Sequence, residues 1–272
     1  MPDGPAVAER DVVYLYDGGF DGFLCCVFES YARREIPAEI LSQDAELLSL
    51  YPQIFIVTDP AHAQRVAQAA RRKIGGPAWD FMRRAFLTCA PHRERDLLLF
   101  VRLGFRFGPR VMQMLADDVV ARLRQAVLHL ENEAHLLLGF ARFSDCGGAL
   151  VSRIGPKNRV LPLLAPHFRA RFPEEYFLIF DSTHGMALVY RPHTAAIVPL
   201  DALEVPAPGR EELDYRRLWR TFYDTVEVPG RHNPKCRMGH MPKRYWEFMT
   251  EFAQDAQAPG GRPQPLPPAA GR

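Results

Sequence analysis

The hydrophobic period of this 272-residue chain changes at about Gly139, and that change restricts the folds open to it. Before Gly139, residues 110–138 carry apolar side chains at the spacing that gives a helix one buried face. After it, residues 140–144 and 149–154 alternate like strands joined by a hairpin. A block of helices followed by a run of strands predicts an α+β fold.

Other segments extend the same pattern. Helical spacing or helix-boundary residues predict further helices at 59–73, 79–90, 94–105, 160–171, 210–224 and 241–256. Alternation predicts further strands at 12–16, 176–181, 186–190 and 196–200, with 182–185 as a hairpin turn. We therefore expect a largely antiparallel sheet of about five strands, packed with a helical block and C-terminal helices.

The ends of the chain differ in composition from its middle. The whole chain is 47% hydrophobic and 24% charged, which is ordinary for a globular protein. From Gln257 onward, five prolines and three glycines in 16 residues are typical of disorder. We predict a flexible N-terminus at 1–10, a single α+β domain at 11–256 and a disordered tail at 257–272.

Cysteine usage and hydropathy favour a cytoplasmic protein. The five cysteines form no CxxC pair and no cluster with histidine at zinc-site spacing. The N-terminal segment MPDGPAVAERD lacks the apolar core of a signal peptide, and no apolar run approaches the roughly 20 residues that span a bilayer. We expect no membrane partner, no metal and no cofactor.

A basic segment near the C-terminus is the first candidate binding region. Residues 231–244 contain five Lys/Arg and no acid, and they lead directly into Tyr245–Trp246. Phosphates respond to such charge, and bases stack on aromatic rings. The candidate nucleic-acid contacts here are Arg231, Asn233, Lys243, Arg244 and Trp246. The alternative is a solvated loop entering a helix whose core face includes Trp246.

A second basic region lies earlier in the chain. From residue 142 to residue 171 there are six Lys/Arg against one acid, Asp145. We expect the arginine at 142 to project from a strand, and the loop around 157–159 to suit phosphate contacts. The candidate contacts are Arg142, Lys157, Arg159 and Arg171. Solvated surface is the alternative.

Four side chains are candidates for acid–base chemistry. Glu131 and His135 are four residues apart and share one helix face. Asp181 ends a strand just before a turn, and His167 is a possible second base or ligand. Glu–His pairs also form for purely structural reasons, so whether the chain is an enzyme stays open.

Several strings spread over residues 12–252 resemble a known family: YLYDGGFDGFL, VTDPAHAQRV, ENEAHLLLGFARF, APHFRARF, FLIFD, RRLWRTFY and RHNP followed by MPKRYW. They are similar to probable DNA metabolism or repair proteins, whose domain is often encoded beside a radical SAM protein. A similar domain is found fused to uracil-DNA glycosylase-like modules. The resemblance implies DNA and a radical SAM protein as partners, and it extends functional interest to Asp17.

Three functions follow from the residues and the resemblance together. The leading hypothesis is a protein that binds damaged or modified DNA through the two basic regions. The second is an enzyme acting on a nucleobase or phosphodiester, with Glu131, His135, His167 and Asp181 gathered in one cleft. The third is a scaffold that docks the radical SAM partner.

Overall fold

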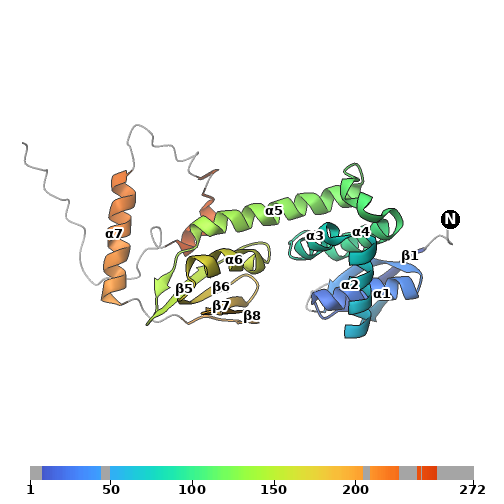
Figure 1. Cartoon of the computed structure of the whole chain (residues 1–272), viewed down its shortest axis with the longest axis horizontal. Helices are drawn as coiled ribbons and strands as arrows, with labels where there is room; N and C mark the ends of the chain where they lie inside the picture. Colours follow the sequence, from blue (N-terminus) through green and yellow to red (C-terminus); the bar gives the residue numbers. More distant parts are fainter. Residues whose placement is uncertain (1–7, 44–49, 205–208, 227–237, 240, 250–272) are drawn as a thin grey trace, which may run out of the picture. The chain divides into compact units, whose positions relative to one another are not determined.

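The computed structural model describes residues 8–43, 50–204, 209–226, 238–239 and 241–249. Contacts within the chain divide it into two compact units. Figure 1 shows the helices and strands of both. The first unit comprises 1–139 and 156–173, and the second comprises 140–155 and 174–272. That residues 11–256 act as one domain stays a prediction. The described residues contain no helix that is both long and apolar enough to cross a membrane.

The first unit contains a three-stranded parallel sheet in the order β2-β1-β3. The strand predicted at 12–16 is present as β1 (Ala8–Tyr16), which begins inside the segment predicted to be flexible. Its neighbours β2 (Glu35–Ser42) and β3 (Gln53–Phe55) were not predicted. β2 contains a proline and β3 has only three residues, so neither gives a clear alternating pattern.

Helices make up the rest of the first unit and agree with the predicted helical block. They are α1 (Phe20–Ala32), α2 (Pro60–Lys73), α3 (Gly76–Phe86), α4 (Arg93–Phe107), the 3₁₀ helix η1 (Gly108–Gln113), α5 (Asp118–Phe140) and α6 (Leu161–Arg171). α2 begins as its sequence indicates, because the Asp59 carboxylate accepts the Ala61 N–H at 2.7 Å and Pro60 needs no N–H partner. α5 begins later than predicted, where Asp117 caps it.

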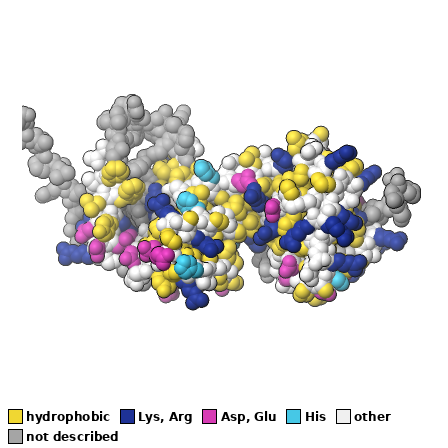
Figure 2. Space-filling view, viewed as in Figure 1, with side chains coloured by type: hydrophobic (Ala, Val, Ile, Leu, Met, Phe, Trp, Pro, Cys, Tyr) yellow, Lys and Arg dark blue, Asp and Glu magenta, His cyan; other side chains and the backbone are white. Residues whose placement is uncertain are grey.

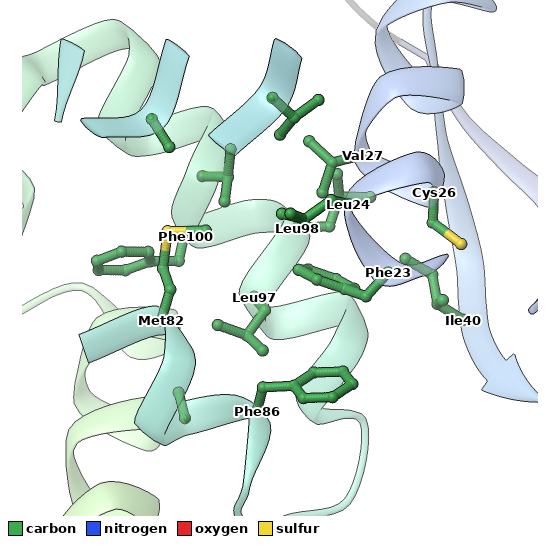
Figure 3. Close-up of a cluster of buried hydrophobic side chains, with 14 of the residues drawn as sticks. Phe23, Leu24, Cys26, Val27, Ile40, Met82, Phe86, Leu97, Leu98 and Phe100 are labelled. Carbon is green, nitrogen blue, oxygen red and sulfur yellow. The ribbon is translucent and has the colours of Figure 1, made fainter. Parts of the chain in front are cut away.

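The core of the first unit joins its sheet to its helices. Phe23 of α1, Leu97 and Phe100 of α4 and Met82 of α3 are fully buried, and Figure 3 shows them in one cluster. Burial of a large apolar side chain stabilises a fold by about 1.5–3 kcal/mol. This packing therefore fixes α1, α3 and α4 relative to one another.

The second unit contains a five-stranded sheet in the order β4-β5-β6-β7-β8. The strands are β4 (Ser144–Asp145), β5 (Ala149–Ile154), β6 (Tyr176–Asp181), β7 (Met186–Arg191) and β8 (Thr194–Pro199). The prediction of a largely antiparallel sheet is wrong, because β5 and β6 pair in parallel and the sheet is mixed. The connection between them contains α6, and parallel neighbours are usually joined through a helix.

The second unit differs from the prediction at two further places. α5 continues to Phe140 and β4 has only two residues, so Arg142 lies in a loop rather than on a strand. The helix α7 (Arg210–Val226) is present as predicted. Of the helix predicted at 241–256, the described part is a 3₁₀ helix, η3 (Lys243–Phe248).

Candidate functional site

A pocket in the first unit brings Glu131 and His135 to one surface. It has a volume of about 690 Å³ and is lined by residues of α3, α5, α6 and the start of α1. Its apolar part includes Phe20, Phe86 and Leu163. The size suits a small ligand, and the mixed lining is usual for such pockets.

The predicted acid–base pair does not form inside this pocket. The Glu131 carboxylate instead accepts a hydrogen bond from Arg84 of α3 at 2.7 Å. His135 is exposed on the pocket wall, and His167 is exposed on α6 outside the pocket lining. The Glu131 carboxylate is therefore placed to position Arg84 rather than to pair with His135.

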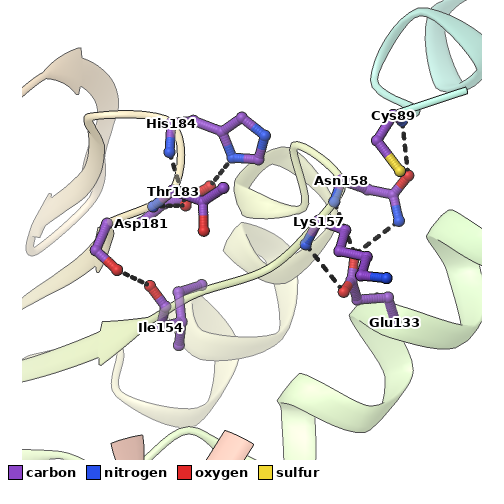
Figure 4. A network of polar contacts seen from close by, with 9 residues as sticks. Cys89, Glu133, Ile154, Lys157, Asn158, Asp181, Thr183 and His184 are labelled. Carbon is purple, nitrogen blue, oxygen red and sulfur yellow. Dashed lines mark hydrogen bonds and ion pairs between the residues drawn. The ribbon is translucent and has the colours of Figure 1, made fainter. Parts of the chain in front are cut away.

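Asp181 forms a different pair, with a histidine that the sequence analysis treated only as part of a turn. The buried Asp181 carboxylate lies 2.7 Å from Nδ1 of His184 and accepts the backbone N–H groups of Thr183 and His184, as Figure 4 shows. A carboxylate on Nδ1 fixes the ring and leaves Nε2 to act as an acid or a base. The sequence signal was a histidine three residues after a strand-ending aspartate.

The four residues proposed for catalysis are distributed over the two units. Asp181 and His184 belong to the second unit, whereas Glu131, His135 and His167 belong to the first. In the first unit Glu131 and His135 line one pocket, and His167 is not among the residues that line it. That all four form one cleft stays a prediction.

A buried carboxylate network shapes the basic loop of the first unit. Glu133 of α5 accepts the backbone N–H groups of Lys157 and Asn158 at 3.0 and 2.8 Å and the Asn158 side-chain amide at 2.6 Å. Asn158 in turn accepts the Cys89 N–H, and its amide nitrogen lies 3.0 Å from Nδ1 of His129. Because that amide nitrogen can only donate, Nδ1 of His129 is the acceptor.

This network holds the main chain beside two predicted nucleic-acid contacts, Lys157 and Arg159. The main chain at Lys157 is held by Glu133, and the Arg159 N–H donates to the Leu87 carbonyl at 2.9 Å. The side chains of Lys157 and Arg159 are exposed. Arg171, at the end of α6, is also exposed and lies 5.5 Å from the Phe172 ring. Sequence reasoning found these cations but missed Glu133 and Asn158, which fix the loop.

In η3, cations lie beside aromatic rings. Lys243 Nζ is 5.9 Å from the Trp246 ring centre, and the Arg244 guanidinium is 4.6 Å from the Tyr245 ring centre. The buried aromatic residue of this helix is Tyr245 rather than Trp246, which is half-buried and donates its indole N–H to the Met241 carbonyl. Arg231 and Asn233 lie outside the described residues.

A second cation–aromatic contact in the same unit was missed. The Arg142 guanidinium lies 6.0 Å from the Trp219 ring centre, and Trp219 stacks on Phe222 with centres 5.5 Å apart. The residues are 41% and 55% exposed. The sequence signal is an apolar stripe along α7, formed with Tyr215 and Leu218, which helical spacing alone would assign to a core.

Metal and thiol chemistry receive little support from the described side chains. No group of three His, Cys, Asp or Glu side chains in the described ranges is placed to hold a metal ion. Burial raises the pKa of the Cys25 and Cys26 thiols, which disfavours the thiolate that a nucleophile needs.

Comparison with known proteins gives one match. A family model described as "Domain of unknown function (DUF4130)" matches residues 91–251, which is more than half of the chain. No curated protein and no solved structure matched the chain. The matched range includes the five-stranded sheet, α7 and η3, and with them the Asp181–His184 pair and the cation–aromatic contacts of the second unit. The chain therefore belongs to the DUF4130 family.

Proposed function

We propose that the second unit binds single-stranded nucleic acid through a surface formed by α7 and the loop before β4. The observation that carries this function is the exposed Trp219–Phe222 stack with Arg142 beside it. Exposed rings accept unpaired bases by stacking, and a neighbouring guanidinium contacts phosphate. We call Arg142, Trp219 and Phe222 the α7 platform.

The anchoring of α7 supports this use of its surface. Arg216 donates to the Ser144 hydroxyl at 2.8 Å and pairs with Glu212 at 2.9 Å. The Ser144 contact ties the helix to β4, and the Glu212 pair within α7 holds Arg216 in place, while the aromatic stripe stays exposed. An exposed stripe of large apolar side chains is uncommon on a soluble protein unless it contacts a ligand or partner.

Cations on two other elements of the second unit support the proposal. Arg153 lies 5.8 Å from the Phe248 ring, and η3 contributes Lys243 and Arg244. Binding through such groups weakens as salt rises, because each phosphate contact releases condensed counterions. The resemblance to repair-linked proteins adds DNA as the expected ligand and a radical SAM protein as a partner, and both stay predictions.

The test is a titration of the full chain with a fluorescent oligothymidylate of about 12 nucleotides, followed by anisotropy. We expect Trp219→Ala and Phe222→Ala each to weaken binding by about 5- to 100-fold, because base stacking contributes roughly 1–3 kcal/mol per ring. Tyr176→Ala is the control, since Tyr176 is a 58% exposed aromatic residue of the same unit. Equal affinities for all three variants and the unmodified chain would rule out the α7 platform.

The contribution of Arg142 is tested in the same assay. Arg142→Gln is expected to lower affinity and to reduce the slope of log Kd against log salt by about 0.7. Arg191→Gln removes an exposed cation from the end of β7 and serves as its control. A salt slope that changes equally in both variants would remove Arg142 from the interface.

A second candidate function is acid–base catalysis at His184. The buried Asp181 carboxylate on Nδ1 is the observation that favours it. Product analysis of labelled single strands after incubation with the full chain would test it. We expect product with the unmodified chain and a loss of roughly 100-fold or more in His184→Gln. Unchanged turnover in that variant would exclude His184 as the base.

A further inference from the structure

An apolar groove in the first unit lies between α1, α2 and α4, away from the pocket that contains Glu131. Its volume is about 340 Å³, at the lower end for ligand pockets. Val27 and Val66 are its buried apolar residues, and three aromatic side chains also line it. These are Phe28 and Tyr31 of α1 and Phe105 of α4. Tyr31 is 40% exposed, and its ring centre is 5.7 Å from that of Phe105.

Each aromatic residue of the groove has a cation beside it. Arg65 lies 5.8 Å from the Phe28 ring centre, Lys73 lies 5.4 Å from that of Phe105, and Arg102 lies 4.5 Å from that of Tyr31. None of the three cations forms an ion pair with a carboxylate in the part of the chain that the structure describes. Three uncompensated cations therefore surround one aromatic groove.

The nearby acids are already engaged elsewhere. Glu29 of α1 pairs with Arg33 at 2.9 Å. Asp59 caps α2 and faces His62, whose ring stacks on Phe28 with centres 3.8 Å apart. The positive charge of the groove is therefore not cancelled by Glu29 of α1 or by Asp59 at the start of α2.

Arg102 shows the imbalance most clearly. Its side chain is half-buried and its hydrogen-bond partner is the Ser30 hydroxyl, at 2.7 Å. Burial lowers the pKa of the Arg102 guanidinium, and no carboxylate counters that effect. A cation taken out of water without a counter-charge costs free energy, and an incoming anion would relieve that cost.

Cations are also frequent in the stretch of sequence that contains α2 and α4. Residues 60–110 contain eleven Lys/Arg against three acids, and Arg71 and Arg72 are exposed beside Lys73 at the end of α2. Figure 2 shows Lys and Arg side chains gathered on this unit. The helix dipole accounts for cations in the last turn of α2, but it does not account for Arg65 or Arg102. A chain of phosphates suits the three cations around the groove, because its charges repeat along one strand.

We infer that this groove is a second site for single-stranded nucleic acid, independent of the α7 platform. One base of the strand packs against Tyr31 and Phe105, and its flanking phosphates contact Arg65, Lys73 and Arg102. Aromatic rings within a cationic groove are the combination that binds unpaired bases without sequence preference.

Cross-linking of the full chain tests this site directly. An oligothymidylate containing 4-thiothymidine is irradiated with the protein, and the cross-linked peptides are identified by mass spectrometry. We expect cross-links to the peptide containing Tyr31 or Phe105, both in the unmodified chain and in the Trp219→Ala/Phe222→Ala variant. Cross-links confined to the second unit would overturn the inference while leaving the α7 platform intact. Cross-links confined to the groove would support the inference and count against the α7 platform.

Two variants quantify binding in the Trp219→Ala/Phe222→Ala background. Tyr31→Ala is expected to weaken the residual affinity by about 5- to 100-fold. Lys73→Glu changes an exposed side chain. We expect it to weaken the residual affinity and to reduce the slope of log Kd against log salt by about 0.7 or more. Arg169→Glu, an equal charge change at an exposed position of α6, is the control. Equal effects of Lys73→Glu and Arg169→Glu would contradict the site.

Competition identifies the occupant. We expect an unlabelled oligothymidylate to displace the labelled strand from this background, and thymidine monophosphate to do so only at far higher concentration, because it offers a single phosphate. A glutamate-rich peptide that competes as well as the oligonucleotide would show that the groove accepts acidic protein segments, and would overturn the assignment to nucleic acid.

Discussion

Asn158→Ala tests how much the buried network around Glu133 contributes to the stability of the first unit. The change removes the 2.6 Å hydrogen bond from the Asn158 amide to Glu133 and the 2.9 Å bond from the Cys89 N–H. A hydrogen bond to a charged group contributes about 1.5–3 kcal/mol, and leaving a donor unpaired adds to that cost. We expect the free energy of unfolding to fall by about 2–4 kcal/mol.

Urea unfolding followed by circular dichroism measures this loss. Asn132→Ala is the matched control, because Asn132 is exposed on the same helix as Glu133 and should change stability by less than about 0.5 kcal/mol. Asn158→Asp should destabilise more than Asn158→Ala, since it places a second carboxylate against Glu133. An Asn158→Ala variant as stable as Asn132→Ala would refute this reasoning.

Two further results are expected. Gly22→Ala should lower the free energy of unfolding in urea by about 1–3 kcal/mol, because an added Cβ would lie 2.8 Å from the Thr58 hydroxyl. Gly76→Ala is the control: its Cβ would meet nothing within 4 Å, so the change should be neutral or slightly stabilising. A Gly22→Ala variant as stable as Gly76→Ala would count against that packing. Burial raises the pKa of the Cys26 thiol, so between pH 7 and pH 9 iodoacetamide should modify exposed Cys89 well before Cys26. Peptide mapping measures the two rates, and equal rates would contradict the buried position of Cys26.

Local sequence signals predicted the helices better than the sheets. α2 was predictable because Asp59 and Pro60 mark its start and its apolar spacing is regular. β2 and β3 were not, since a parallel sheet depends on distant partners and gives weak alternation. Residues 140–143 alternate like a strand, yet α5 continues to Phe140, because alternation over a few residues does not exclude a helix end.

The candidate site was predictable only in part, for a similar reason. Helical spacing placed Glu131 and His135 on one face, and they share a pocket. Spacing could not show that Arg84, which is distant in sequence, would take the Glu131 carboxylate. It also could not show that the apolar stripe around Trp219 would stay exposed, because a stripe indicates burial without naming the partner that covers it.

The most direct test of the proposed function measures the affinity of the full chain for a single strand at several salt concentrations by anisotropy. The same measurement on the Trp219→Ala/Phe222→Ala variant shows how much of that affinity depends on the α7 platform. With three or four phosphate contacts, we predict that log Kd rises with log salt with a slope of roughly 2 to 3. We also predict that the variant binds at least about 5-fold more weakly at every salt concentration. Absence of binding at low salt, or an affinity that neither salt nor the substitutions change, would contradict nucleic-acid binding by this protein.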